Sequence, residues 1–357
     1  MQSKSKGITL IALVITIIVL LILAGVAIVT LTGDNGILTK AVEAKEKTET
    51  AAETEERTLE LLEKQLNEKG EITVSGLKVG DYIEYGEKLT TQTYLTNTNE
   101  EPNTGYEKSQ TFNTDTFTLW RVINKKDNGD VEIVAVNNTL SSDGTTGLYL
   151  KGENGFLNAE TILNNLCSKL YSNPAYGTGR SIDVADINNL TGFNPETSEW
   201  EGKDYYLNNR TKSYTRGGPF FDKISNTFRE ATAENPITVD YTYYYYTVDE
   251  NMPLYDTLIE SSKSYSGEYK ETNYPMFYWL GSRCTYAVDY VRYRIFMIGA
   301  GSVRSWYTTE RFTTLWLVDY SYACAIRPIV TLNSNVQIDT SDTTKDGSEA
   351  GKAWILK

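Results

Sequence analysis

The chain contains no histidine, and its 357 residues include only three cysteines and eight prolines. Histidine is the side chain most often used as a general base or metal ligand near neutral pH, so its absence argues against an enzyme. Three cysteines are too few for a dense disulfide framework, and no CxxC pair occurs, which argues against the common zinc sites. A Walker loop, a nucleophile elbow and a phosphate-binding glycine fingerprint are also missing. We therefore predict a protein that is not an enzyme and that has no cofactor and no metal site.

Basic residues are in short supply. The 34 lysines and arginines are outnumbered by 47 acidic residues, which gives a formal net charge of -13. A surface of this charge repels polyanions, so we expect no nucleic-acid partner. The hydrophobic content of 40% is nevertheless enough for a globular core.

The N-terminal region holds the longest apolar run. No charged residue occurs between Lys6 and Asp34, and as a helix this run would be about 40 Å long. That length exceeds the ~30 Å hydrocarbon core of a bilayer. Because Lys4 and Lys6 precede the run and acidic residues follow it, the N-terminus is expected in the cytoplasm and the rest outside. We therefore predict that residues 8–33 form a hydrophobic helix that lies in the membrane or packs in a filament.

Two ordinary interpretations of this run are a cleaved secretory signal and a plain signal anchor. Cleavable signals have an apolar stretch of only ~7–15 residues before a small-x-small site. The run is longer than that, although Gly25-Val26-Ala27 offers a weak cleavage motif. The length favours an uncleaved helix over a secretory signal.

A third interpretation comes from residues 6–11, Lys-Gly-Ile-Thr-Leu-Ile. This motif resembles the type IV prepilin signature, in which a short basic leader and a Gly precede an apolar helix. The resemblance implies that residues 1–7 are a leader, that a prepilin peptidase cuts after Gly7, and that Ile8 is then methylated. It also implies other pilin subunits as partners. Ala12 stands where that family usually has Glu.

Residues 34–70 are predicted to form a charged stalk helix. They are rich in Ala, Glu, Lys and Leu, lack proline, and end at Gly70. Leu59, Leu62 and Leu66 recur at helical spacing and give one apolar stripe near the end. The rest is polar all round, so a solvated stalk and packing in a bundle both remain open.

Residues 71–357 are predicted to form one α+β head dominated by β-strands. Short runs of Val, Ile, Thr, Tyr and Trp alternate with Gly, Asn and Asp, and residues 117–136 are the clearest hairpin. The apolar spacing predicts helices over residues 157–172, beginning near Asn158, and over 181–190. Residues 241–248 form a tyrosine cluster, which favours a strand with one wet face over a binding site. Asp183 and Asp186 are interpreted as a helix cap rather than as a catalytic pair, and Cys167 as a buried thiol.

The segment 284–324 has a different composition from the rest of the head. It contains six tyrosines, two tryptophans and two phenylalanines, and all of its basic residues are arginine. Tyr, Trp and Arg are enriched at binding surfaces, because stiff rings give contact area at low entropic cost and arginine stacks or forks onto acceptors. The candidate ligand-binding residues are Tyr286, Asp289, Tyr290, Tyr293, Arg294, Arg304, Trp306, Tyr307, Arg311, Trp316, Asp319, Tyr320 and Tyr322.

The alternative is that this segment is two or three core strands with aromatic cross-strand pairs. Side chains of a strand alternate between its two faces, so about half of the candidates would then be core residues. The composition alone does not separate a binding surface from a core.

Two sequence frames enclose the segment: Tyr-Trp-Leu-Gly-Ser-Arg at 278–283 and Ala-Ile-Arg-Pro-Ile-Val at 325–330. Together with the hairpin, they resemble C-type-lectin-fold domains, including those related to formylglycine-generating enzymes. The asparagine-free tract between the frames resembles the variable segment of proteins diversified by retroelements. Cys284 and Cys324 lie at its edges, where a lectin-like topology would bring them together, as a disulfide or as two free thiols.

These observations predict a pilin-like protein, membrane-anchored or pilus-associated, that displays a C-type-lectin-like head outside the cell. Its ligand would be a protein or a glycan, bound through a surface that a retroelement diversifies. The alternative is a structural minor pilin or pseudopilin whose head only packs against neighbouring subunits. A formylglycine-generating type of enzyme is a distant third, and no catalytic residue of that family carries over to this chain.

Overall fold

The structure is a computed structural model of the chain. It falls into two compact units, residues 1–71 and 72–357. The residues that it describes are 15–23, 40, 44–45, 47–48, 72–97, 109–114, 119–196, 205–263, 273–287, 290–312 and 317–357.

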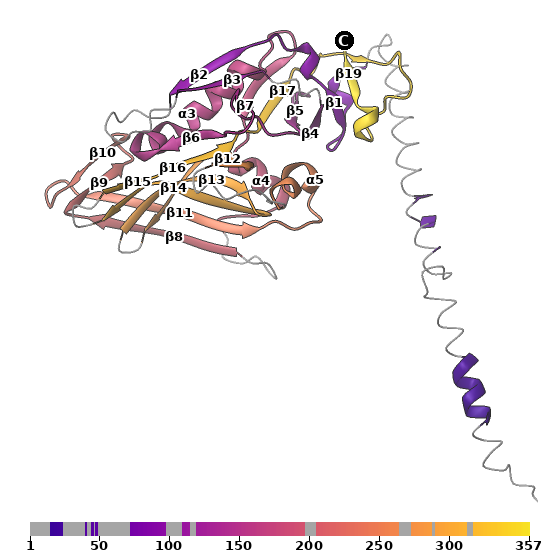
Figure 1. Ribbon diagram of the computed structural model, residues 1–357, viewed down its shortest axis with the longest axis horizontal. Coiled ribbons are helices and arrows are strands. Elements are labelled where there is room, and N and C mark those ends of the chain that lie inside the picture. The colour runs from indigo at the N-terminus through magenta and orange to yellow at the C-terminus, as the bar shows by residue number, and fades with distance from the viewer. Residues whose placement is uncertain are drawn as a thin grey trace, which may run out of the picture. The chain divides into compact units, whose positions relative to one another are not determined.

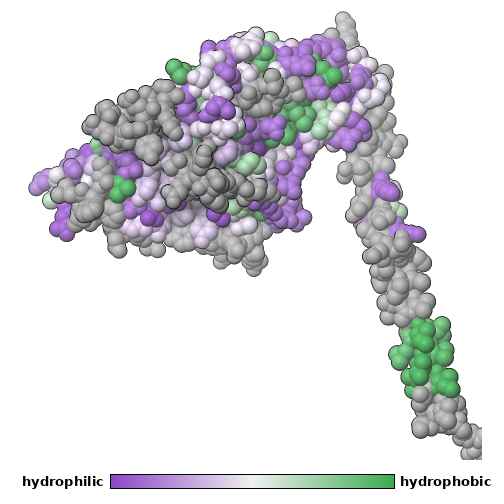
Figure 2. All heavy atoms as spheres, in the orientation of Figure 1, coloured by the Kyte–Doolittle hydropathy of each residue, from purple (hydrophilic) through white to green (hydrophobic). Residues whose placement is uncertain are grey.

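In the first unit, residues 15–23 are helical and their side chains are exposed. They form the hydrophobic stretch that Figure 2 shows in green. Residues 40, 44–45 and 47–48 of the predicted stalk are also helical. The leader, Gly7, Ile8 and the remainder of both predicted helices lie outside the described residues. Among the helices in the described part of the chain, none combines the length and hydropathy that crossing a membrane requires.

The second unit is mixed α/β with mostly β-structure, and its first large sheet has seven strands. All neighbouring strands in this sheet are antiparallel, except for β1 (Tyr82–Glu84) and β19 (Trp354–Leu356), which are parallel. The order across this sheet is β18 (Ile338–Asp339), β19 (Trp354–Leu356), β1 (Tyr82–Glu84), β4 (Leu119–Lys125), β5 (Val131–Ala135), β17 (Pro328–Leu332) and β7 (Gly177–Ser181).

The second large sheet has eight strands and carries most of the segment 284–324 (Figure 1). Strand β15 (Leu317–Asp319) pairs with β14 outside the main path. The order of the others is β6 (Leu148–Lys151), β16 (Ser321–Ala325), β12 (Asn273–Ala287), β13 (Tyr290–Gly299), β14 (Ser302–Phe312), β11 (Ile237–Thr247) and β8 (Tyr205–Tyr214).

Smaller elements complete the second unit. Two hairpins pair β2 (Thr93–Asn97) with β3 (Ser109–Asn113) and β9 (Gly217–Asp222) with β10 (Thr227–Ala231). The helices are α3 (Gly152–Tyr171), α4 (Val184–Thr191) and α5 (Tyr255–Leu258). Short 3-10 turns occur at Val74–Gly76, Gly86–Lys88, Glu260–Ser262 and Ala350–Lys352.

Several predicted elements are confirmed. The hairpin within residues 117–136 is β4 paired with β5. The helix predicted over 181–190 is α4, and the Asp183 carboxylate accepts from the Asp186 amide while Asp186 accepts from the Asp183 amide, which is a capping box. The tyrosine cluster is part of β11. Its Tyr244 and Tyr246 are buried, whereas Tyr245 is exposed.

The helix predicted over 157–172 begins earlier than expected. α3 starts at Gly152, so Asn158 lies inside the helix and does not cap it. The extra turn buries Gly155 and Phe156, and Phe156 packs in a core cluster with Val291 and Tyr293. Burial of this ring extends the helix beyond the point where the capping pattern alone predicts its start.

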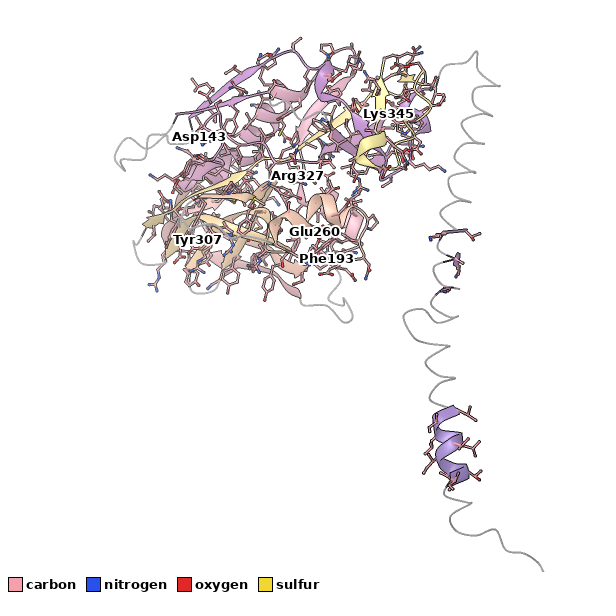
Figure 3. All side chains as sticks on the ribbon, turned by 45° about the vertical axis from the view of Figure 1, so that its right-hand side comes forward. Asp143, Phe193, Glu260, Tyr307, Arg327 and Lys345 are labelled. Carbon is pink, nitrogen blue, oxygen red and sulfur yellow. The ribbon has the colours of Figure 1, made fainter. Side chains whose placement is uncertain are left out.

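The two large sheets are joined where the chain passes from β16 to β17. Arg327 lies in this connection and is 1% exposed (Figure 3). Its Nε donates to Asn138 Oδ1 at 2.9 Å, its Nη1 donates to the Thr257 carbonyl, and the guanidinium lies 4.6 Å from the centre of the Tyr278 ring. Burial lowers the pKa of Arg327. This arginine belongs to the second sequence frame, and its contacts join the β16–β17 connection to Asn138, Thr257 and Tyr278.

Candidate ligand-binding surface

Strand β13 crosses the centre of the segment 284–324, and its side chains alternate between two environments. Tyr290, Arg292 and Arg294 are half-exposed, whereas Val291 and Tyr293 between them are buried. This is the period of two that a strand imposes on its side chains. One face of β13 therefore faces the solvent and the other faces the core.

The neighbouring strands place further residues on the same face as the two arginines. Arg292 is opposite Tyr286 on β12 and opposite Glu310 on β14, and Arg294 is opposite Tyr307. Residues that are directly opposite in a ladder point to the same side of the sheet. Three strands thus contribute to one row of aromatic and charged side chains.

These side chains contact one another in a closed ring. The Arg292 guanidinium lies 4.5 Å from the centre of the Tyr290 ring and 4.6 Å from that of Tyr307. The Arg294 guanidinium lies 5.3 Å from Tyr307 and 4.8 Å from Tyr243, which comes from β11. The remaining contacts, between ring centres, are Tyr243 to Tyr286 at 5.1 Å and Tyr286 to Tyr290 at 6.5 Å. We call these six residues the arginine–tyrosine surface.

One acidic residue anchors this surface. The Glu310 side chain is 7% exposed and forms an ion pair with Arg292. Burial would lower the pKa of Arg292, but its hydrogen bond and charge interaction with Glu310 raise that pKa above the ordinary value. Arg292 is thus held in a fixed position and stays charged, with two aromatic rings stacked against it.

A second aromatic cluster continues from Tyr307 toward β16. The Tyr307 ring centre lies 4.5 Å from that of Tyr320, and Trp306 lies 4.3 Å from Tyr322 in an edge-to-face contact. Burial raises the pKa of Tyr320, and the nearby Tyr307 and Glu310 add to this shift. All four of these predicted residues are half-exposed. They extend the candidate surface across the start of β16.

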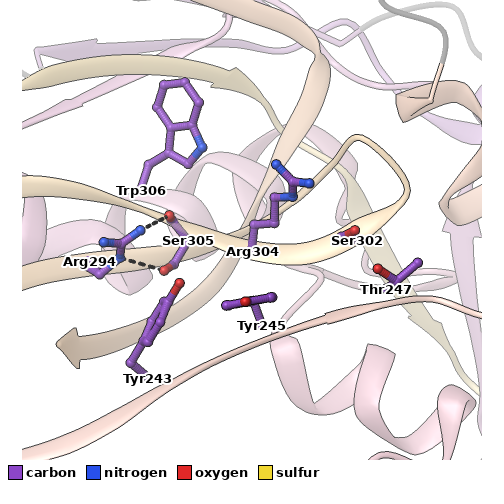
Figure 4. A pocket seen from close by; sticks show the side chains of 8 residues that line it. All are labelled: Tyr243, Tyr245, Thr247, Arg294, Ser302, Arg304, Ser305 and Trp306. Atoms are coloured by element: carbon purple, nitrogen blue, oxygen red, sulfur yellow. Dashed lines mark hydrogen bonds between the residues drawn. The ribbon is translucent and has the colours of Figure 1, made fainter. Parts of the chain in front are cut away.

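A cleft of about 550 Å³ opens beside this surface, between β11 and β14 (Figure 4). The two strands pair only at Tyr246 with Val303 and at Thr247 with Ser302, and they separate beyond these positions. Arg294 crosses the base of the opening, where it donates to Ser305 Oγ at 2.7 Å and to the Ser305 carbonyl at 2.5 Å. The lining residues are Tyr243, Tyr245, Thr247, Arg294, Ser302, Arg304, Ser305 and Trp306.

Two predicted contact residues belong to the core instead. Tyr293 is fully buried, its ring packs against Phe156 at 5.1 Å and Phe228 at 4.8 Å, and its hydroxyl accepts from the Phe221 amide. Arg311 is fully buried as well, and it forms an ion pair with Asp319. Strand alternation turns both side chains away from the arginine–tyrosine surface. They are therefore removed from the candidate set.

Three further predicted residues, Asp319, Asp289 and Trp316, are not part of the arginine–tyrosine surface as described. Asp319 is engaged by Arg311 at 3.1 Å and by the Thr309 hydroxyl at 2.5 Å. Thr309 is opposite both Asp319 and the buried Tyr293, so Asp319 lies on the side of the sheet that faces the core. Asp289 and Trp316 lie outside the described residues.

The disulfide considered between Cys284 and Cys324 is absent, and both cysteines are free and buried. Cys324 on β16 pairs with Tyr274, which is ten residues from Cys284 along β12. The register of β12 shifts twice between Tyr274 and Cys284, and Cys284 is opposite Arg294 on β13 and not opposite β16. Burial raises the pKa of Cys284 to about 12. Cys167 is also a free, buried thiol, as predicted.

The sequence interpretation missed three contributors to the site. Arg292 was noted only as part of the arginine-rich composition, although it alternates with Tyr290 and Arg294. Tyr243 and Tyr245 belong to the tyrosine cluster 241–248, for which the sequence favours a strand with one wet face over a binding site. Nothing in the sequence places β11 next to β14.

The chemistry of the site is that of recognition. Aromatic faces, arginine forks and hydroxyl groups can stack on, pair with and hydrogen-bond a ligand. Among the described residues, no group of three or more His, Cys, Asp and Glu side chains is placed to hold a metal ion.

Comparison with known proteins gives no relatives: no protein-family model, no curated protein sequence and no solved structure matches this chain.

Proposed function

We propose that this protein is a binding protein displayed at the cell surface, and that its second unit binds a protein or glycan ligand through the arginine–tyrosine surface and the adjoining cleft. The observation that carries the proposal is the ring of contacts around Arg292 and Arg294. Four tyrosines and two arginines are half-exposed and contact one another, whereas most other aromatic rings among the residues with described burial lie in the core.

The physical argument is preorganisation. Each arginine is held between aromatic rings and is also fixed by a hydrogen-bonding partner, Glu310 for Arg292 and Ser305 for Arg294. Side chains fixed in this way lose little conformational entropy when a ligand arrives. Half-exposed Tyr and Arg groups are the kind that dominate binding energy at interfaces.

We further propose that residues 1–70 anchor this head as a pilin-like N-terminus. The support is the sequence: the basic leader, Gly7 and the uncharged run up to Gly33. Processing by a prepilin peptidase and association with other pilin subunits follow from this resemblance. The C-type-lectin-like character of the head is proposed on the hairpin and the two sequence frames, and its diversification by a retroelement on the asparagine-free tract between the frames.

The test of the binding function uses the full-length chain in lipid nanodiscs. The chain is applied to a glycan array and to a panel of intact bacterial cells and phages, alongside a triple variant with Tyr286→Ser, Tyr290→Ser and Tyr307→Ser. Tyr94→Ser, on the separate hairpin of β2 and β3, is the matched control. We expect the triple variant to lose at least about tenfold in affinity for the captured target, with unchanged circular dichroism and melting temperature.

Equal capture by the wild type and the triple variant would contradict a role for this surface. Capture of no target, combined with incorporation of the protein into a filament, would favour the structural pilin instead.

A further inference from the structure

The cleft between β11 and β14 is lined by an arginine, Arg304, whose guanidinium is not engaged by another described side chain. Arg304 is exposed, and among the described residues it has no hydrogen-bond or ion-pair partner. Arg294, by contrast, is engaged by Ser305 and by two tyrosine rings. The chain therefore holds one arginine in place at the base of the cleft and leaves a second available at its rim.

The charge of this cleft is opposite to that of the chain. Its eight lining residues include two arginines and no aspartate or glutamate, whereas the whole chain has a net charge of -13. A local positive potential in an acidic protein attracts an anionic group to this place and not to the surrounding surface. A cation without a carboxylate partner is also free to form a forked pair with an incoming carboxylate.

The walls of the cleft supply two further kinds of contact. Trp306 and Tyr245 present aromatic faces on the two strands, with Trp306 on the same side of β14 as Arg304 (Figure 4). The hydroxyls of Thr247 and Ser302 line the end where the strands meet. Sugar rings have apolar C–H faces that pack on aromatic rings and hydroxyl rims that hydrogen-bond to such groups.

We propose that this cleft binds a pyranose ring that carries a carboxylate, as in the acidic sugars of an anionic glycan. Arg304 forms a forked pair with the carboxylate, Trp306 or Tyr245 stacks on the ring face, and the hydroxyls of Thr247 and Ser302 bind the sugar hydroxyls. The volume of about 550 Å³ fits one or two sugar rings. This inference rests on the proposed binding function and names its ligand class.

An acidic peptide offers carboxylates but lacks a rigid apolar face bordered by hydroxyls, so it uses the arginine and leaves the aromatic walls with little to contact. The combination of one available arginine, aromatic walls and several hydroxyls therefore favours the acidic sugar. Acidic peptide serves as a competing ligand in the test.

The experiment measures binding of the full-length chain in nanodiscs by isothermal titration calorimetry and by tryptophan fluorescence. The probes are oligogalacturonate, hyaluronan oligosaccharide and sialyllactose, each paired with its methyl-esterified form, which keeps the sugar and removes the charge. A polyglutamate peptide is the fourth probe. Arg304→Gln removes the available charge, and Arg216→Gln, an exposed arginine in the turn between β8 and β9, is the matched control.

We expect at least one acidic oligosaccharide to bind, and its methyl ester to bind at least about tenfold more weakly. Arg304→Gln should weaken binding by a similar factor, Arg304→Lys should restore part of it, and Arg216→Gln should leave it unchanged. Because the pair is electrostatic, raising the salt concentration should weaken the wild type more than Arg304→Gln. Trp306→Leu should weaken binding without removing its salt dependence.

The inference is overturned if no acidic oligosaccharide binds, if acid and ester bind equally, if Arg304→Gln binds as the wild type does, or if polyglutamate binds as tightly as the sugars. Failure of the binding function is distinguishable from each of these results. If the arginine–tyrosine surface still captures a protein or neutral glycan in the array experiment, the proposed function stands and only the acidic-sugar assignment falls.

Discussion

The Arg311 guanidinium on β14 forms an ion pair of 2.5 Å with the carboxylate of Glu153 on α3. A second ion pair, of 3.1 Å, joins Arg311 to Asp319 on β15. The Arg311 side chain is 1% exposed and that of Asp319 is 9% exposed. The segment 284–324, which contributes most of the candidate surface, therefore also forms an ion pair with α3 on the other side of the sheet.

Replacement of Arg311 should reduce stability. Arg311→Ala leaves the Asp319 carboxylate buried without its cation, and loss of one partner of a buried ion pair typically costs about 3–5 kcal/mol. We expect a loss of about 3 kcal/mol in the free energy of unfolding, because the Glu153 side chain retains 26% exposure to water. Urea denaturation measures this value. Arg304→Ala, on the exposed rim of the cleft, is the control and should change it by less than about 0.5 kcal/mol.

The three thiols should behave as free, protected groups. Burial raises the pKa of Cys284 to about 12 and that of Cys324 well above its ordinary value, so the reactive thiolate is scarce at pH 8. We expect Ellman's reagent to react with all three cysteines after unfolding and with none of them promptly in the native protein. Intact mass and melting temperature should be the same with and without reductant. A two-dalton mass difference on reduction would show a disulfide and contradict the free state of these cysteines.

Local sequence patterns predicted the head well wherever neighbours in the chain decide the structure. The turn residues between β4 and β5, the capping box of α4 and the alternation along β11 all act over a few residues. The predicted start of α3 was wrong because Phe156 packs in the core against residues that are distant in the sequence, such as Val291 and Tyr293. Tertiary packing outweighs a local capping preference when a large ring is buried.

The sequence predicted which segment carries the candidate residues, but not which of their side chains reach the solvent. Composition identified the segment 284–324, whereas the assignment of each side chain to the surface or to the core requires strand register. Tyr290 and Tyr293 are the same residue type three positions apart, yet only Tyr290 reaches the solvent. The sequence left a disulfide and two free thiols open for Cys284 and Cys324, and the free thiols are confirmed.

Acid should destabilise the head through Glu132, which is 6% exposed and lies 3.1 Å from Arg180. Burial by itself would raise the pKa of Glu132, but the Asn124 amide and the charge of Arg180 bring it below its ordinary value of 4.5. A depressed pKa in the folded state means that the unfolded state binds the proton first. Glu132 therefore contributes stability above pH 4.5, and this contribution is lost as the pH falls through the folded pKa.

Melting temperature measured from pH 7 to pH 3 tests this. Glu132→Gln should be less stable than the wild type at pH 7, by about 1–3 kcal/mol, because Arg180 loses a charged partner. The difference should shrink below pH 4.5, where the wild-type carboxylate becomes protonated. Glu234→Gln, an exposed position near β10, should follow the wild-type curve at every pH. Parallel curves for Glu132→Gln and the wild type would contradict this linkage.

Diversification, if a retroelement acts on this gene, should follow the faces of the strands. A randomised AAC or AAT codon reaches Tyr and Arg but not Met, Trp or Glu, so Met297, Trp306 and Glu310 must be fixed. Replacement of a fully buried ring such as Tyr293 by alanine costs about 3–5 kcal/mol, whereas substitution on a half-exposed face is tolerated. Variable codons should therefore encode the half-exposed residues of the segment 284–324 on β12, β13 and β14, apart from Trp306.

The DNA beside the gene provides the measurement. We expect a reverse transcriptase gene and a near-copy of the segment encoding residues 284–324, with differences confined to adenines of the copy. These differences should fall at Tyr286, Tyr290, Arg292, Arg294 and Tyr307, and not at Val291 or Ile295, which face the core. Differences spread equally over buried and half-exposed codons would argue against selection for a binding surface. Absence of the copy would remove diversification and leave a fixed arginine–tyrosine surface, whose ligand would then be the same in every isolate.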